Sequence, residues 1–166
     1  MSTETTAVPP IALEDGAGEA LWFLGGLVTI KAGGDDTAGR VAVMEYRAPH
    51  GVGSPLHVHR REDEWFYVLE GNLTFWVGGR TISAGPGSFV YGPRDVPHTF
   101  EVASHEARFL LVAEPGGFER FVRAASDVVA TPTLPPAPGA PPDLERLTAL
   151  AAENGIDIIG PPGIPS

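Results

Sequence analysis

The sequence predicts an all-β protein, an antiparallel double-sheet barrel followed by short C-terminal helices. Its 21 glycines and 17 prolines in 166 residues exceed average usage and favour many tight turns. Between residues 21 and 114, about nine short segments rich in β-branched and aromatic residues alternate with those turns. No helical pattern interrupts them, and short strands in such a succession are typical of a barrel or a two-sheet sandwich.

The length is that of one domain, large enough to bury a core. We expect residues 1–12, which are rich in Thr and Pro, to form a flexible tail, and residues 13–115 to form the barrel. Residues 116–166 are then expected to hold the C-terminal helices and a Pro-rich segment, both packed on the barrel.

The predicted strands follow one another in chain order. Residues 21–31 predict the first strand, with a bulge at its Gly25-Gly26 pair. Residues 64–71 predict a strand that ends at Gly71, and residues 72–77 return from it after a tight reversal. The remaining predicted strands cover residues 41–48, 56–59, 81–82, 88–91, 98–104 and 107–114.

The pattern changes after residue 115. Apolar residues at helical spacing predict a helix over residues 118–129. Residues 131–142 contain so many prolines that we expect an extended segment without a regular ladder. Residues 143–155 predict an amphipathic helix that ends at an Asn-Gly pair, with Leu144, Leu147 and Leu150 on one face.

Composition excludes several classes of function. With 21 acidic and 11 basic residues the formal net charge is −10, which disfavours binding to nucleic acid. The absence of cysteine excludes disulfides, thiolate metal sites and cysteine nucleophiles. No signal-peptide pattern and no run of about 18 apolar residues are present. We therefore expect a cytoplasmic protein that does not bind membranes.

The densest group of metal-binding side chains lies between residues 57 and 98. His57 and His59 are two residues apart on a predicted strand, so both rings emerge on the same face. Glu64 follows a four-residue turn and returns beside them in an antiparallel pair, and His98 opens a later strand. Three imidazoles and one carboxylate suit Fe, Ni, Mn, Co or Zn, and the sequence leaves the metal's identity open. Glu62 shares the strand parity of Glu64 and is an alternative ligand.

The stretch from Gly51 to Gly71 resembles the first signature of the cupin superfamily, Gly-x5-His-x-His-x4-Glu-x6-Gly, at every position. The second signature, Gly-x5-Pro-x-Gly-x2-His-x3-Asn, is matched by Gly87, Pro93 and His98. The chain departs from it at Asp95, where the family has Gly, and at Val102, where it has Asn. Asp tolerates positive φ well enough to preserve the turn. The resemblance implies a jelly-roll barrel and the metal ligands His57, His59, Glu64 and His98.

Segments on either side of these signatures, "GGLVTIKAGG" and "EPGGFERFV", are similar to small bacterial quercetinase-like monocupins. That likeness implies a dioxygenase that cleaves flavonols with O₂, and the family analogy also implies a homodimer. Glu64 would stay a metal ligand or act as general base on an enol or phenol. We expect a hydrophobic oxygenated aromatic or enol, flavonol-like or polyketide-like, as the small-molecule substrate.

Strand parity suggests which side chains line the substrate pocket. Phe66 and Val68 share the parity of Glu64, and Phe100 and Val102 share that of His98. Further candidates are Met44, Tyr46, Phe75 and Trp76. His50 and His105 are expected to be exposed loop residues.

Two other functions fit the same residues. One is a non-oxidative metal-dependent isomerase, cyclase or lyase that uses the ion as a Lewis acid. The other is a small-molecule binding protein without turnover. A barrel of this kind hosts many activities, so the fold does not choose among the three.

Overall fold

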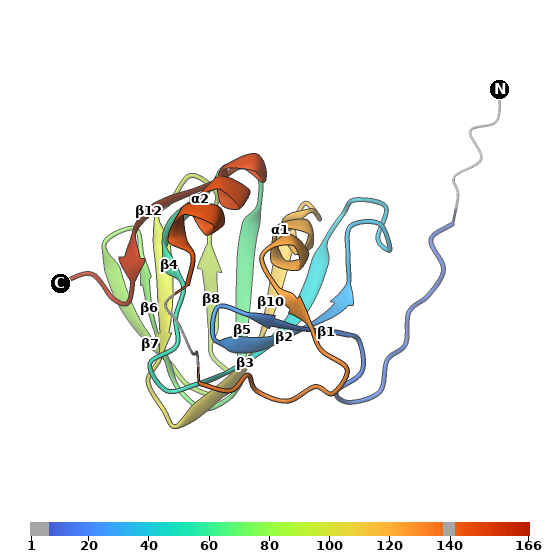
Figure 1. Ribbon diagram of the computed structural model, residues 1–166, viewed down its shortest axis with the longest axis horizontal. Helices are drawn as coiled ribbons and strands as arrows, with labels where there is room; N and C mark the ends of the chain where they lie inside the picture. The colour runs from blue at the N-terminus through green and yellow to red at the C-terminus, as the bar shows by residue number, and fades with distance from the viewer. Residues whose placement is uncertain (1–6, 138–141) are drawn as a thin grey trace.

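The computed structural model describes residues 7–137 and 142–166 and confirms the all-β prediction (Figure 1). Within these residues twelve strands form two antiparallel sheets, accompanied by two short helices. The helices are α1 (Phe118–Ala124) and α2 (Leu144–Glu153). The strands are β1 (Glu19–Phe23), β2 (Gly26–Ala32), β3 (Ala42–Pro49), β4 (Pro55–His59), β5 (Asp63–Glu70), β6 (Leu73–Val77), β7 (Arg80–Ala84), β8 (Phe89–Gly92), β9 (His98–Val102), β10 (Glu106–Glu114), β11 (Asp127–Val128) and β12 (Ile156–Pro162).

The two sheets face each other as a jelly roll. One has the strand order β11-β1-β2-β3-β10-β5-β8, and the other has the order β12-β4-β9-β6-β7. The alternating burial of strands such as β3, β5 and β10 shows one face of each directed inward. The core between the sheets is rich in aromatic residues, among them Phe66, Phe75, Phe100 and Phe109.

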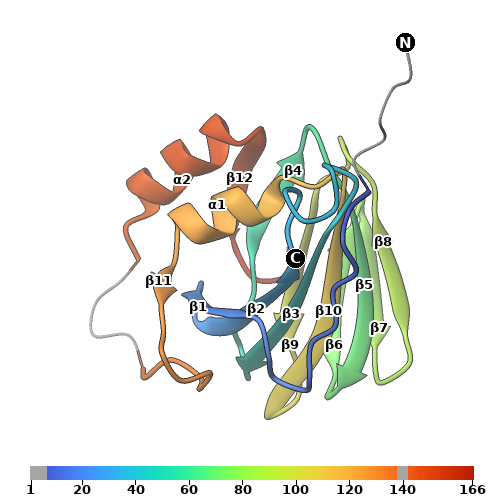
Figure 2. The same cartoon turned by 90° about the vertical axis from the view of Figure 1, so that its right-hand side faces the viewer.

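Both helices lie at one end of the barrel, with α2 beside β12 (Figure 2). Asp143 caps α2 by accepting a hydrogen bond from the backbone N–H of Arg146. Leu147 and Ala151 are buried, but Leu144 is exposed because it lies in the first turn and points away from the barrel. Neither helix of the described chain is long and apolar enough to span a membrane.

Three expectations about the elements are wrong. Residues 21–31 form a hairpin of two strands, because Leu24 and Gly25 both adopt positive φ and make a two-residue turn where a bulge was expected. The helix at 118–129 ends at Ala124, because Asp127 and Val128 pair with β1 instead. Strand β12 was not predicted, and it pairs with β4.

The predicted division of the chain into a tail, a barrel and a C-terminal part, with boundaries at residues 12 and 115, stays a prediction. Residues 131–137 contain no strand or helix, as expected of a proline-rich segment. Residues 138–141 of the same predicted segment lie outside the described residues. Residues 1–6 of the expected flexible tail lie outside them as well.

Candidate metal centre

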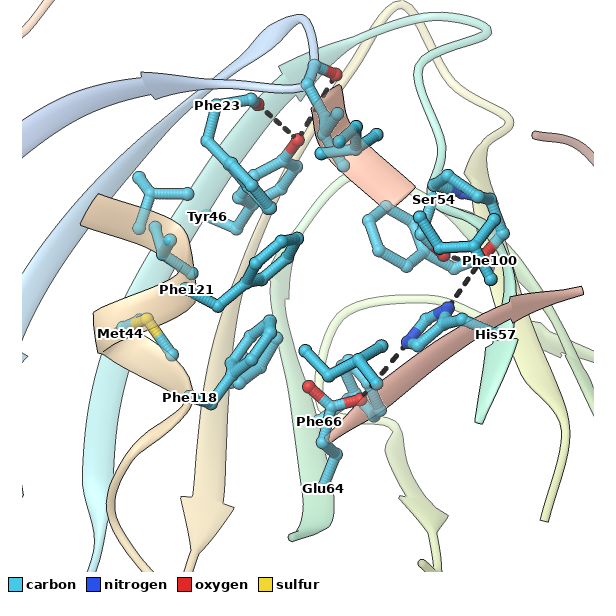
Figure 3. Close-up of a pocket in the computed structure, with 18 of the residues that line it drawn as sticks. Phe23, Met44, Tyr46, Ser54, His57, Glu64, Phe66, Phe100, Phe118 and Phe121 are labelled. Carbon is cyan, nitrogen blue, oxygen red and sulfur yellow. Dashed lines mark hydrogen bonds and ion pairs between the residues drawn. The ribbon is translucent and has the colours of Figure 1, made fainter. Parts of the chain in front are cut away.

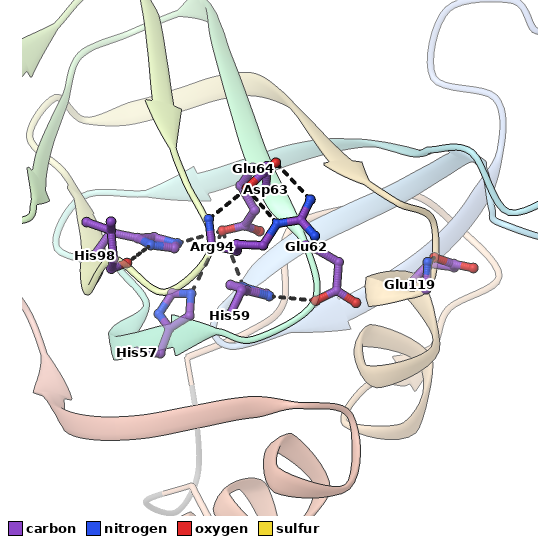
Figure 4. A network of polar contacts seen from close by, with 10 residues as sticks. His57, His59, Glu62, Asp63, Glu64, Arg94, His98 and Glu119 are labelled. Carbon is purple, nitrogen blue, oxygen red and sulfur yellow. Dashed lines mark hydrogen bonds and ion pairs between the residues drawn. The ribbon is translucent and has the colours of Figure 1, made fainter.

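Three strands of the barrel bring His57, His59, Glu64 and His98 together (Figure 4). His57 and His59 lie on β4, and Glu64 is the second residue of β5. His98 begins β9, where it pairs with His57 in register. One possible ligand atom from each residue lies within 4.8 Å of the others, and all four residues are buried. Glu64 Oε2 lies 2.7 Å from His98 Nε2, 3.3 Å from His59 Nε2 and 3.9 Å from His57 Nε2.

The other ring nitrogen of each histidine faces an oxygen behind the cluster. His57 Nδ1 lies 2.7 Å from the carbonyl oxygen of Pro55, and His98 Nδ1 lies 3.0 Å from that of Val96. His59 Nδ1 lies 3.2 Å from a carboxylate oxygen of Glu62. Each of these oxygens is placed to accept a hydrogen bond from Nδ1–H, and in that tautomer the Nε2 lone pair is directed at the centre.

The electrostatics of the cluster favour an ionised carboxylate among imidazoles. Burial lowers the pKa of His57 to about 4, against the opposing contact with Glu64. Burial also opposes ionisation of Glu64, but His59, His57 and His98 together hold the pKa of that carboxyl well below its ordinary value. Burial disfavours a charged His59, yet Glu64 and then Glu62 raise the pKa of its ring.

This arrangement fits a divalent metal ion. His98 has oxygen acceptors at both ring nitrogens, although a neutral imidazole carries only one N–H. His59 Nε2 is fully buried and has no hydrogen-bond partner in the part of the chain that the structure describes. A cation among the Nε2 atoms and Glu64 Oε2 would satisfy both of them, and imidazole nitrogen with one carboxylate is a common donor set for transition metals.

Glu62 is not a member of the cluster. Its buried carboxylate lies behind His59, on the side of the ring away from Glu64 (Figure 4). His50 and His105 are exposed, as predicted. Asp95 has a φ of 63°, the left-handed conformation that the second signature usually gives to glycine.

An apolar cavity of about 60 Å³ reaches the cluster at His57 and Glu64 (Figure 3). Predicted lining residues that do contribute to it are Met44, Tyr46, Phe66 and Phe100. Tyr46 donates a hydrogen bond to the carbonyl oxygen of Phe23, 2.9 Å away, and burial raises the pKa of its phenol. Of the four polar residues in the wall, Tyr46, Ser54, His57 and Glu64, the last two belong to the cluster.

Three predicted pocket residues do not line this cavity. Val68, Phe75 and Val102 point inward, as strand parity requires, but they pack within the core away from the cluster. Trp76, another candidate, is also absent from the wall. Strand parity predicts which face of a strand a side chain occupies, but not how far along the barrel it lies. The prediction therefore included inward-facing residues that do not reach the cavity.

The far wall of the cavity comes from the C-terminal part of the chain. Phe118 and Phe121 of α1 face the cavity opposite His57 (Figure 3), and the ring of Phe118 meets that of His59 edge-on at a centroid distance of 4.9 Å. The helical spacing of Phe118 and Phe121 predicts a helix that packs on the barrel. It does not indicate that the two rings line a cavity. The other lining residues from this region are Val122, Leu147, Ile156 and Ile158.

Comparison with known proteins gives consistent results. Residues 43–113 match the family model described as a cupin domain. Quercetin 2,3-dioxygenase from Bacillus subtilis is 34% identical over 128 residues, which are 75% of this chain and 38% of that protein. The enzyme of the same name from Aspergillus japonicus is 31% identical over 106 residues, 56% of this chain and 30% of that protein. The matched region thus spans only 38% and 30% of the length of these relatives.

Among solved structures, an RmlC-like cupin from Shewanella frigidimarina superimposes with a TM-score of 0.57 at 15% identity. The match covers 69% of this chain and 99% of that one. At this identity the likeness concerns the fold alone.

Proposed function

Because the chain belongs to the cupin superfamily and is quercetinase-like in sequence, we propose that it is a metal-dependent dioxygenase acting on a hydrophobic oxygenated aromatic or enol. One observation carries the proposal: a group of three histidines and one glutamate opens directly onto an apolar cavity. An apolar lining with a few polar groups is typical of small-molecule sites, and at about 60 Å³ this cavity would have to enlarge to admit a flavonol-sized substrate.

The residues have distinct roles in this proposal. His57, His59, Glu64 and His98 would hold the metal, which supplies Lewis acidity and, if it is redox-active, reactivity toward O₂. Rings of Phe66, Phe100, Phe118 and Phe121 bind and orient the substrate and exclude water.

Glu64 is the proposed proton acceptor. It is the only carboxylate that lines the cavity within the described residues, and its environment keeps it ionised. Its Oε1 makes no hydrogen bond within the described chain, so that oxygen is free to accept a proton from a substrate hydroxyl group.

Metal content is the first test. Protein purified without a nickel-affinity step is expected to contain one of Fe, Ni, Mn, Co or Zn at about one ion per chain. His98→Ala should lose more than the roughly 10–100-fold in affinity that removal of an outer partner costs. His105→Ala, which changes an exposed histidine, is the matched control. Equal metal content in both variants would contradict the site.

Dependence on O₂ is the second test. Flavonols and catechols should be consumed in air and not under anaerobic conditions. Product that forms equally without O₂ would contradict the oxygenase and favour a non-oxidative isomerase, cyclase or lyase. Zinc in the native protein would favour the same alternative, because zinc has no redox chemistry. Unchanged ligand affinity in a His57→Ala, His59→Ala double variant would favour binding without turnover.

The homodimer implied by the family analogy is also a proposal. Light scattering on the purified protein tests it directly, and a monomer at micromolar concentration would contradict it.

A further inference from the structure

The three histidines of the cluster differ in what stands behind them. His57 and His98 each direct Nδ1 at the carbonyl oxygen of the residue two positions earlier in the chain, Pro55 and Val96. His59 alone directs Nδ1 at a carboxylate, that of Glu62. A carboxylate is a stronger hydrogen-bond acceptor than a carbonyl and carries a full negative charge. The three rings are therefore not equivalent donors toward the centre.

Glu62 is buried with fewer hydrogen-bond partners among the described residues than the other buried glutamate outside the cluster. Two glutamates, Glu62 and Glu119, are almost fully buried outside the cluster, at 4% and 1% exposed. Glu119 accepts hydrogen bonds from the backbone N–H groups of Gly34 and Gly117, both at 2.8 Å. The carboxylate of Glu62 has one hydrogen-bond partner in the described chain, the ring of His59.

A buried carboxylate with few partners is costly in free energy, because burial removes it from water. Glu62 therefore belongs functionally with His59. The family signature leaves this position open, since residue 62 is the third of the four unspecified residues between His59 and Glu64.

We propose that Glu62 is a positioning residue that holds His59 in the Nδ1–H tautomer and makes its Nε2 the most electron-rich imidazole donor of the site. The inference rests on the metal-binding function proposed above. Hydrogen bonding of a ligating histidine to a carboxylate fixes the ring orientation and raises ligand basicity. His59 is the ring for which this matters most, because its Nε2 is fully buried and has no hydrogen-bond partner among the described residues.

Glu62→Gln tests the proposal, because it keeps the size of the side chain and removes its charge. With Co²⁺ as the probe and a competing chelator, we expect the variant to bind about 10–100-fold more weakly than the wild type. The visible d–d absorption bands of bound Co²⁺ should also shift, which a loss of stability alone would not cause.

Glu45→Gln is the control, since it makes the same change at a carboxylate with a side-chain exposure of 16% that pairs with Lys31 and Arg108 and not with a histidine. It should leave the Co²⁺ affinity within about twofold of the wild type and the absorption bands unchanged. Equal weakening in both variants, or an unchanged Glu62→Gln protein, would overturn the inference and leave the proposed metal function intact. A wild-type protein that binds no Co²⁺ would overturn both.

A measurement on the wild type covers the case in which Glu62→Gln fails to fold. In the Zn²⁺-loaded protein, nitrogen-edited NMR of the imidazoles should show the Nδ1–H proton of His59 further downfield than those of His57 and His98. Equal shifts for the three rings, or a proton on His59 Nε2, would overturn the proposal.

Discussion

His57 illustrates how a single side chain in the site is kept neutral by its surroundings. Its side chain is only 12% exposed, and burial lowers its pKa from 6.5 to about 4. A neutral ring is the form that a metal requires, because a protonated nitrogen has no lone pair to donate. The apolar environment therefore favours the metal-binding form of this residue.

We expect the metal-free protein to lose stability as the pH falls from about 6.5 to about 4. Over this range the unfolded chain binds a proton at His57 that the folded chain does not, so the free energy of unfolding decreases. A difference of 2.5 pKa units corresponds to a loss of unfolding free energy on the order of 3 kcal/mol at the lower end of this pH range. Urea unfolding at several pH values in the presence of a chelator measures it.

His57→Gln is the comparison, since it removes the titrating group. Its unfolding free energy should fall less steeply with pH over the same range. Identical slopes for the wild type and the variant would show that His57 does not cause the effect.

The sequence predicted the four residues of the cluster because their placement depends on strand parity and on one hairpin. His57 and His59 follow from alternation, and Glu64 from the antiparallel return. His98 was placed by its strand position and by the second signature. The position of Glu62 behind His59 could not be predicted, because parity gives the face of a strand and not the direction of a neighbouring turn side chain.

Helix α1 depends on contacts with the rest of the molecule. With seven residues it is too short to be stable in isolation. Glu119 fixes it by accepting hydrogen bonds from Gly34 after β2 and from Gly117 at the start of the helix. The cavity wall formed by Phe118 and Phe121 is therefore positioned by a carboxylate that lies between them in the sequence.

Glu119→Ala should lower the free energy of unfolding by about 1–3 kcal/mol, because one buried and one part-buried N–H group lose their acceptor. Glu145→Ala, a change in the first turn of α2 at an exposed position, should stay within about 0.5 kcal/mol. Denaturant unfolding of both variants checks this, and equal stability would contradict the role of Glu119.

Strand β12 supports the strand that carries the histidines. Ile156 pairs with His59 and Ile158 pairs with His57, so β12 covers the outer edge of β4. It was missed because its sequence, "IDIIGPP", ends in glycine and prolines, which argue against a strand. The edge position explains how the prolines are tolerated. Strands β3 and β5 could be predicted because inward-facing and outward-facing residues alternate along them.

Ile156→Ala should destabilise the protein by about 2–4 kcal/mol, because it leaves a cavity beside His59 at a buried position. Ile159→Ala changes the same residue type on the same strand where the side chain is 53% exposed, and it should cost less than about 0.5 kcal/mol. Thermal unfolding of the two variants measures the difference in stability. Similar midpoints for both variants would show that β12 is not packed on β4.

At the scale of the whole molecule, the site is shared between the barrel and the C-terminal part of the chain. The cavity of about 60 Å³ is far smaller than the roughly 300–1,000 Å³ of pockets that hold drug-sized ligands. A flavonol-sized substrate would therefore have to displace side chains of α1, α2 or β12. The family signatures describe the barrel and carry no information about this wall, so the size of the cavity could not be predicted from them.

Phe121→Ala should enlarge the cavity and lower stability by about 3 kcal/mol. Apolar cavities of this kind bind small aromatic molecules such as benzene. Benzene should therefore raise the unfolding temperature of Phe121→Ala more than that of the wild type. Leu144→Ala, at an exposed position on α2, should show no such gain. Equal shifts in all three proteins would contradict the assignment of Phe121 to the cavity wall.

The pairing of β12 with β4 sets an order of events while the protein is made. Ile156 follows its partner His59 by 97 residues (156 − 59), which takes a ribosome about 5–20 seconds to add. During that interval one side of the imidazole-bearing strand remains open to pairing with another nascent chain. A centre in which β4 is paired with β12 therefore exists only after translation has passed residue 158, and chaperones that shield β4 until then should improve the yield of folded protein.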